Sequence, residues 1–309
     1  MHTVDEVVQV ADTGVHPWVQ ARVPQSDRFA ALREELEWAL TTAVTDMEFA
    51  RGFAAAQPQS GQPAEAYLNR WLTVTTDLDV LVGPRYRARN PERPFVAVDA
   101  ASRLITAADL AALGAATADS FAAFKPEYVS LWSCDPDGRW PGTRSDTRNV
   151  AGRLGELRPN NVPPELSAEI ATGLDFYERY AQIHRDQVAR EPAHALHTRI
   201  ESREDLGELL EARTLFDVLL GGQWAGLVAA EPGVQHSLRG AVVVELFLDA
   251  SVRGRGYGKH LSTLLAQQVE APENQFLLGT IHVDNTSAYR SALASGRQDV
   301  GGEVIVPLT

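Results

Sequence analysis

A glycine-rich turn near the C-terminal end carries the residues best placed to do chemistry. The apolar run 242–249 leads into Arg253-Gly254-Arg255-Gly256-Tyr257-Gly258-Lys259-His260. Three glycines at alternate positions let the backbone adopt left-handed conformations, so successive N–H groups can point into one concavity at the start of a helix. Such a concavity binds anions, and a pyrophosphate is the anion that this pattern indicates.

Residue spacing separates this turn from two other phosphate-binding turns. A P-loop would need Gly in place of Arg253 and Ser or Thr in place of His260. A Rossmann turn would need Gly in place of Lys259. The pattern that fits is Arg-x-x-Gly-x-Gly, formed by Arg253, Gly256 and Gly258. It resembles the acyl-CoA pyrophosphate signature of the GNAT superfamily of N-acyltransferases.

The elements around the turn follow the order that this resemblance implies. The predicted elements are a helix over 257–269 ended by Pro272, a strand over 276–283, a helix from Asp284 or Asn285 to Gly296, and a strand over 303–308. Upstream, we predict a helix over 175–189, a helix opened by Ser202, and a hairpin of strands over 215–220 and 224–230. Residues 128–132 are our candidate for the first strand of the fold.

The N-terminal part of the chain, residues 1–125, is predicted to be an additional α/β domain. Its expected elements are helices over 27–44 and 106–124 and strands over 78–82 and 94–98. It lacks Arg-x-x-Gly-x-Gly, so a degenerate GNAT-like unit and an unrelated α+β domain both stay open.

The predicted fold class is therefore α/β (α+β), with a mixed, mostly antiparallel GNAT-like sheet flanked by helices over 126–309. The segment 134–164 is rich in Asp, Gly, Pro and Asn and shows little periodicity. We expect it to be an interdomain linker, with a substrate-covering loop as the alternative.

The resemblance implies acetyl-CoA as the acyl donor and assigns the residues that hold it. Backbone groups of Leu246 and Leu248 would align the pantetheine arm and the acyl carbonyl, while the amides of Arg255 to Lys259 would cradle the pyrophosphate. The predicted cofactor-binding residues are Leu246, Phe247, Leu248, Arg253, Gly254, Arg255, Gly256, Tyr257, Gly258, Lys259 and Asn285.

Three residues are candidates for catalysis. An amine must lose a proton before it attacks a thioester, and Glu245 is the best candidate base. Family members commonly carry a Tyr seven residues after the Asn as the acid for the departing thiolate, but here Ala292 stands there. Tyr289, one turn earlier, could substitute or could simply pack, and solvent could also deliver the proton. His282 is a further candidate, although strand histidines are more often packing residues.

Composition excludes several other classes of function. The formal charge of −13 over 309 residues argues against nonspecific nucleic-acid binding and is compatible with a cationic substrate. No apolar run is long enough for a membrane span, and the N-terminus does not resemble a signal peptide. The single Cys134 allows no intrachain disulfide, so we expect a cytoplasmic protein. His194 and His197 lack an obvious third ligand, so no metal site is expected.

These features together predict an N-acetyltransferase that moves an acetyl group from acetyl-CoA to a small-molecule or peptide amine by direct attack. A homodimer is compatible with this prediction. Because Ala292 replaces the usual Tyr, the alternative is a regulatory or scaffolding module that binds acetyl-CoA without turning it over.

Overall fold

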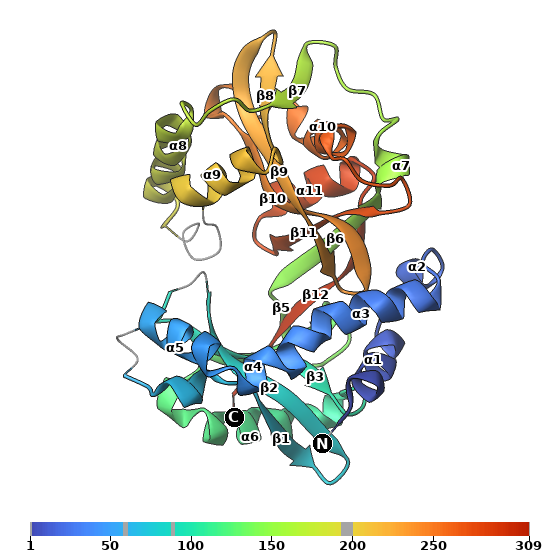
Figure 1. Ribbon diagram of the computed structural model, residues 1–309, viewed down its shortest axis with the longest axis vertical. Helices are drawn as coiled ribbons and strands as arrows, with labels where there is room; N and C mark the ends of the chain where they lie inside the picture. The colour runs from blue at the N-terminus through green and yellow to red at the C-terminus, as the bar shows by residue number, and fades with distance from the viewer. Residues whose placement is uncertain (1, 58–60, 88–89, 193–199, 309) are drawn as a thin grey trace. The chain divides into compact units, whose positions relative to one another are not determined.

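The computed structural model describes residues 2–57, 61–87, 90–192 and 200–308 (Figure 1). The chain divides into two compact units. Unit 1 consists of Met1–Thr147, Val234–Leu238 and Val300–Thr309, and unit 2 consists of Arg148–Gly233 and Arg239–Asp299.

Unit 1 is built on a mixed sheet whose strands lie in the order β1-β2-β3-β4-β12, with β5 also paired to β12. The strands are β1 (Arg70–Thr75), β2 (Leu78–Tyr86), β3 (Pro94–Ala101), β4 (Tyr128–Ser133), β5 (Arg144–Ser145) and β12 (Gln298–Pro307). The helices are α1 (Val4–Thr13), α2 (Pro17–Gln20), α3 (Gln25–Leu40), α4 (Thr42–Thr45), α5 (Met47–Ala56) and α6 (Leu110–Ser120). Short 3-10 turns are η2 (Ala64–Tyr67), η4 (Ala107–Asp109) and η5 (Ala122–Phe124).

The core of unit 1 lies between its sheet and α6. Leu110, Leu113 and Thr117 recur every three or four residues of α6 and are buried. They meet alternate residues of β2, such as Val80 and Val82, which are fully buried. Helices α1 and α3 pack on each other and on β3.

Unit 2 contains a sheet with the strand order β6-β11-β10-β9-β8-β7. The strands are β6 (Thr147–Arg153), β7 (Leu166–Ile170), β8 (Leu215–Leu220), β9 (Gln223–Gln235), β10 (Leu238–Leu248) and β11 (Phe276–His282). The helices are α7 (Leu154–Leu157), α8 (Tyr177–Arg190), α9 (Arg203–Glu211), α10 (Leu261–Gln268) and α11 (Thr286–Ala294), with 3-10 turns η7 (Ala250–Val252) and η8 (Tyr257–His260).

Two separate apolar clusters cover the two faces of the unit 2 sheet. On one face Leu261, Leu264 and Leu265 of α10 pack on the strands. On the other face Tyr180 of α8 and Leu206 of α9 do so, and Figure 1 shows these helices on opposite sides of β8, β9 and β10. This three-layer arrangement buries an apolar stripe of each helix.

The two units share one order of elements. In unit 1, helices α1 to α5 precede strands β1, β2 and β3, which are followed by α6 and β4. In unit 2, helices α8 and α9 precede strands β8, β9 and β10, which are followed by α10 and β11. The third and fourth strands pair in parallel in both units, β3 with β4 and β10 with β11. The two units thus share this part of their topology, and both alternatives for the N-terminal part, a degenerate GNAT-like unit and an unrelated α+β domain, stay predictions.

The structure confirms the predicted elements nearest the turn. Asn285 is the N-cap of α11, with its side chain accepting from the Ala288 N–H, and Ser202 opens α9 with a capping box. The 215–220 and 224–230 hairpin is present as β8 and β9, with Gly221 and Gly222 in left-handed conformations at its turn.

Two predictions about upstream segments were wrong. Residues 128–132 do form a strand, β4, but it pairs with β3 and β12 in unit 1, and the edge strand next to β8 is β7. The segment 134–164 is not a plain loop, because it contains β5, β6 and α7. The apolar positions of these short elements, such as Val150 of β6 and Leu154 of α7, are too few and too closely bounded by polar turn residues to form a periodic pattern.

The compact units also differ from the predicted division into 1–125 and 126–309. The boundary falls after Thr147, because β4 and β5 pair with strands of unit 1. The assignment of separate functional roles to residues 1–125 and 126–309 stays a prediction.

Candidate functional site

The parallel strands β10 and β11 pair over a short length only. Their register joins Gly240–Val242 to Phe276–Leu278, and among the described residues it extends no further. The remaining six residues of β10, from Val243 to Leu248, therefore leave their backbone groups on this edge without a β11 partner. Unpaired strand edges offer N–H and C=O groups to an extended ligand.

A break in side-chain alternation occurs where the strands part. Val243 and Leu246 pack in the cluster beneath α10, whereas Val244 packs in the cluster beneath α8 and α9. Glu245 also faces α8, because its carboxylate accepts a hydrogen bond from Tyr180. Two consecutive residues on the same face mark a β-bulge, which turns the Glu245 side chain toward α8.

The Glu245 carboxyl has the titration range of a general base. Burial raises its pKa to about 7, although hydrogen bonds from the Tyr180 phenol and the Leu246 N–H favour the ionised form. The Leu246 N–H lies 3.0 Å from Glu245 Oε1. A carboxyl that titrates near neutral pH can accept a proton and release it again under the same conditions.

Tyr180 is a site residue that the sequence analysis did not predict. It is fully buried, and its hydroxyl donates to Glu245 and accepts from the Glu201 N–H at 3.1 Å. Its ring meets that of Phe247 edge to face, with centroids 4.8 Å apart. The sequence predicts the 175–189 helix that carries Tyr180, but an apolar spacing that places an aromatic ring in the core contains no signal for its hydroxyl.

The glycine turn has the backbone geometry of an anion cradle. Gly254 and Gly256 have φ values of +77° and +84°, and a side chain at either position would meet nothing within 4 Å. These two glycines are therefore required by backbone conformation. Glycine is needed at position 258 for lack of space, because a Cβ there would lie 3.0 Å from Ser291 Oγ on α11.

The N–H groups at the start of η8, immediately after Gly256, have no partners within that helical turn. They are therefore available to an anion at the turn.

The three basic side chains of the turn have different roles. Arg253 Nε donates to the Leu248 carbonyl at 2.8 Å and its Nη1 donates to Gln187 Oε1 at 2.9 Å. Arg253 therefore fastens the turn to β10 and α8. Arg255 and Lys259 are exposed and form no ion pair among the described residues, so their charges face solvent beside the cradle.

A second contact fastens the turn to α8. The Arg179 guanidinium pairs with the buried Asp249 at 2.5 Å. Asp249 also caps η7, because its carboxylate accepts from the N–H and the hydroxyl of Ser251. Helix α8 thus supports the turn through Arg179 and the base candidate through Tyr180.

The remaining predicted cofactor-binding residues contribute mainly through packing. Leu246, Leu248 and Tyr257 lie in the cluster beneath α10, and Phe247 lies in the opposite cluster. The Tyr257 hydroxyl donates to Glu165 at 3.2 Å. Their side chains fix the strand and the turn, which leaves the backbone for ligand binding.

The two other catalytic candidates, Tyr289 and His282, form hydrogen bonds with residues other than Glu245. Tyr289 donates to Asp299 Oδ2 at 2.6 Å, and Asp299 in turn pairs with Arg148. Because Ser291 faces Gly258 of the turn, Tyr289, two residues earlier and about 200° around the helix, faces away from the turn.

His282 is the last residue of β11. Its Nδ1 accepts from the Asp284 N–H at 3.2 Å.

Several sequence-based expectations concern absences. Within the described ranges, no group of three His, Cys, Asp or Glu side chains could hold a metal ion. His194 and His197 lie outside the described residues. Every helix in the described part of the chain is too short or too polar to cross a membrane.

Comparison with known proteins gives a likeness of structure without a likeness of sequence. No protein-family model matches the sequence, and no curated protein matches it significantly. The structure is similar to that of a GCN5-related N-acetyltransferase from Sphaerobacter thermophilus, with a TM-score of 0.50 and 14% sequence identity. The match covers 85% of this chain and 91% of that chain, which is more than either unit alone.

The chain has the fold of the GNAT superfamily. Two weaker matches are a GNAT-family acetyltransferase from Colwellia psychrerythraea (TM-score 0.46, 10% identity, 74% of this chain and 86% of that chain) and a GCN5-related N-acetyltransferase from Kribbella flavida (0.44, 14%, 85% and 94%). In this chain the unpaired edge of β10, the bulge at Glu245 and the glycine turn follow one another between Val243 and Lys259.

Proposed function

We propose that unit 2 transfers an acetyl group from acetyl-CoA to an amine by direct attack. The observation that carries the proposal is the Glu245 carboxyl, which has a pKa of about 7 and lies on the strand that leads into the glycine turn. A base on this strand can deprotonate an amine, and the glycine turn that follows can bind the phosphates of the acyl donor. The two features together therefore fit a reaction between an amine and a phosphorylated donor.

The residues of the turn fit the pyrophosphate of an acyl-CoA. Gly254 and Gly256 leave open space where side chains would otherwise project, and Arg255 and Lys259 supply positive charge without an internal ion pair. The unpaired edge of β10 would hold the extended pantetheine arm through backbone hydrogen bonds. These residues would thereby position the thioester near the bulge.

The proposed chemistry moves one proton to Glu245. An ammonium has no lone pair, so the ionised carboxylate removes a proton directly or through water. The nitrogen lone pair then bonds to the acyl carbon and the carbon–sulfur bond breaks, so that the sulfur leaves as thiolate. The nitrogen, now cationic, releases its extra proton to solvent to give the neutral amide, and the thiolate takes up a proton. Tyr180 holds the carboxylate in place and Phe247 restricts the Tyr180 ring.

Solvent is the proposed proton source for the thiolate. Ala292 is buried and has no acidic proton, and the Tyr289 hydroxyl is already committed to Asp299. A CoA thiol is acidic enough that a bound acid contributes less here than at an alkoxide leaving group.

Ala292 and Tyr289 also favour a second candidate function, a module that binds acetyl-CoA without catalysis, because neither residue supplies an acid for the thiolate. Calorimetric titration with acetyl-CoA, followed by measurement of free CoA in the presence of small amines and peptides, separates the two. Binding with CoA release supports the transferase; binding without release from any amine supports the module. The acceptor class, a cytoplasmic location and a homodimer stay predictions from the sequence.

A further inference from the structure

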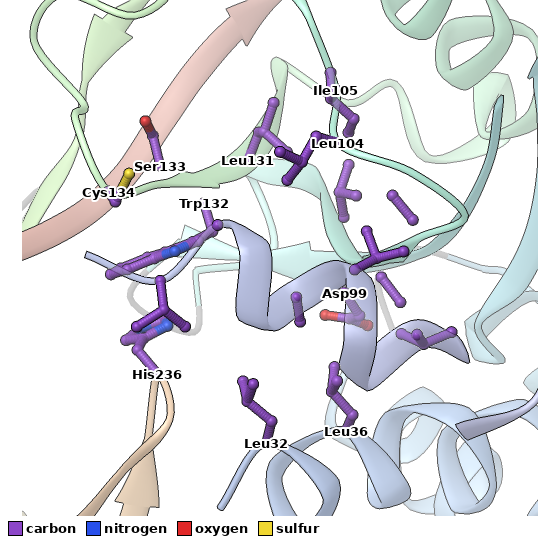
Figure 2. A pocket seen from close by; sticks show the side chains of 18 of the residues that line it. Leu32, Leu36, Asp99, Leu104, Ile105, Leu131, Trp132, Ser133, Cys134 and His236 are labelled. Atoms are coloured by element: carbon purple, nitrogen blue, oxygen red, sulfur yellow. The ribbon is translucent and has the colours of Figure 1, made fainter. Parts of the chain in front are cut away.

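Two adjoining cavities lie within unit 1, and their lining includes none of the residues assigned to the proposed transferase. The first has a volume of about 380 Å³ and is lined largely by apolar side chains such as Leu32, Leu36 and Leu131 (Figure 2). The second has a volume of about 490 Å³ and is lined by Phe53, Tyr86 and Phe95 together with polar groups. Val98, Asp99 and Glu303 line both cavities.

The Glu303 carboxyl at this boundary lacks a cationic partner. It accepts one hydrogen bond, from Ser130 Oγ at 2.8 Å, and no Lys, Arg or His among the described residues forms an ion pair with it. Burial and the nearby carboxylates of Asp99 and Asp146 raise its pKa to about 7. A buried carboxyl without a counter-ion is costly to ionise, and a bound cation would reverse that cost.

A second, independent feature is an unpaired amide oxygen in the second cavity. Gln57 is only 6% exposed, and its Oε1 has no hydrogen-bond partner among the described residues. Buried amide oxygens are nearly always hydrogen-bonded in proteins, so this oxygen calls for a donor supplied from outside the chain. An N–H donor fits it.

The other carboxylates around the cavities have cationic or N–H partners within the protein. Asp99 pairs with Arg85 at 2.8 Å, and Arg87 pairs with Asp146 at 2.5 Å. The other charged or titratable groups that line the cavities are Glu35, bound by the N–H groups of His236 and Ser237; Arg103, paired with Asp77 and Asp109; Arg139, placed over Trp140; and the side chains of His16, Tyr86, Cys134 and His236. Among the described residues that line the cavities, Glu303 is therefore the carboxyl without a cationic or N–H partner.

We propose that unit 1 binds an organic ammonium ion with an apolar body. The ammonium lies in the second cavity, where Glu303 is its counter-ion and Gln57 Oε1 accepts one of its N–H groups. The aromatic rings of Phe53, Tyr86 and Phe95 add a favourable surface for a cation. The apolar body extends toward the leucine-lined first cavity. This site shares no residue with the proposed transferase site and does not depend on the proposed function.

Calorimetric titration of the full chain with hexylammonium chloride tests this site, with 1-hexanol as a neutral probe of the same shape. We expect hexylammonium to bind at one site and Glu303→Gln to weaken it at least tenfold, because Gln keeps the shape and removes the charge. Gln57→Leu should also weaken it, whereas Glu37→Gln on the exposed face of α3 should not. Hexanol should bind more weakly and with the same affinity to the parent and to Glu303→Gln.

Proton release gives a further readout. Hexylammonium stays protonated while its binding converts Glu303 from carboxylic acid to carboxylate. At pH 6, titrations in phosphate and in MES should therefore reveal release of up to about one proton per ligand, and Glu303→Gln should release none. The proposal is overturned if hexylammonium does not bind, if Glu303→Gln binds it equally well, or if hexanol binds as tightly. If Glu303→Gln does not fold, Gln57→Leu decides: unchanged binding of hexylammonium overturns the proposal.

Discussion

The phenol of Tyr180 on α8 donates a hydrogen bond to the carboxylate of Glu245 on β10. This contact joins the helical layer to the strand that leads into the glycine turn. Without the phenol the carboxylate would lose one of its two recorded hydrogen-bond donors, the other being the Leu246 N–H. The pair therefore determines where and at which pH the proposed base can work.

Tyr180→Phe should raise the pKa of Glu245 further above 7. The phenol favours the ionised carboxylate, so its loss favours the neutral acid, while Phe keeps the packing against Phe247. The rise of kcat/KM with pH should move to higher pH, and a 13C NMR titration of the Glu245 carboxyl should show the same shift. An unmoved titration would mean that the phenol does not act on this carboxyl.

Gly256→Val should weaken acetyl-CoA binding at least tenfold. Valine is strained at φ +84° and would displace the N–H groups of the turn. Gly207→Ala on α9 is the matched control, because that position is helical and open, and it should bind acetyl-CoA normally. Calorimetry on both variants, each checked for folding by circular dichroism, makes the comparison. Equal affinity in a folded Gly256→Val protein would remove the turn from the cofactor site.

Tyr289→Phe should reduce stability by about 1 kcal/mol and leave kcat unchanged. It removes the hydrogen bond to Asp299, which is also held by Arg148. Urea unfolding and steady-state kinetics measure the two effects. A fall in kcat of about 10²-fold with unchanged acetyl-CoA affinity would instead identify Tyr289 as the acid for the thiolate.

Glu303→Gln should stabilise the protein at pH 8 and have little effect near pH 5. Because the pKa of Glu303 is raised to about 7, its neutral form is the one that the fold favours. That stabilising contribution is fully present below the pKa of the unfolded chain, about 4.5, and is lost as the pH rises through 7. At pH 8 the buried charge therefore lowers the free energy of unfolding of the parent by roughly 1–3 kcal/mol. Gln carries no charge, so the variant does not lose this stability.

Urea unfolding at pH 5 and pH 8 tests this dependence. The exposed Glu37→Gln variant should match the parent at both pH values. A Glu303→Gln variant that is no more stable than the parent at pH 8 would show that the carboxylate is already compensated.

The sequence predicted the local parts of the site and missed the parts that depend on contacts across the fold. Glycine spacing and the Asn285 cap are local signals, and both are present as predicted. The Tyr180–Glu245 contact joins residues 65 positions apart in the sequence. The bulge in β10 can be recognised only from the core cluster that each of its side chains joins, which the sequence does not give. The position of β4 in the sheet could not be predicted either, because the sequence of a short apolar strand does not specify which strand it pairs with.

Release of free CoA from acetyl-CoA, measured across small amines and peptides for the parent and Glu245→Gln, tests the central claim most directly. Gln keeps the size of the side chain and removes its basicity. The account predicts that the parent releases CoA with at least one amine. It predicts that Glu245→Gln binds acetyl-CoA normally but loses rate near pH 7, with partial recovery at high pH where the amine is already neutral. The account is contradicted if acetyl-CoA binds but no amine releases CoA, or if the pH–rate profile of Glu245→Gln overlays that of the parent.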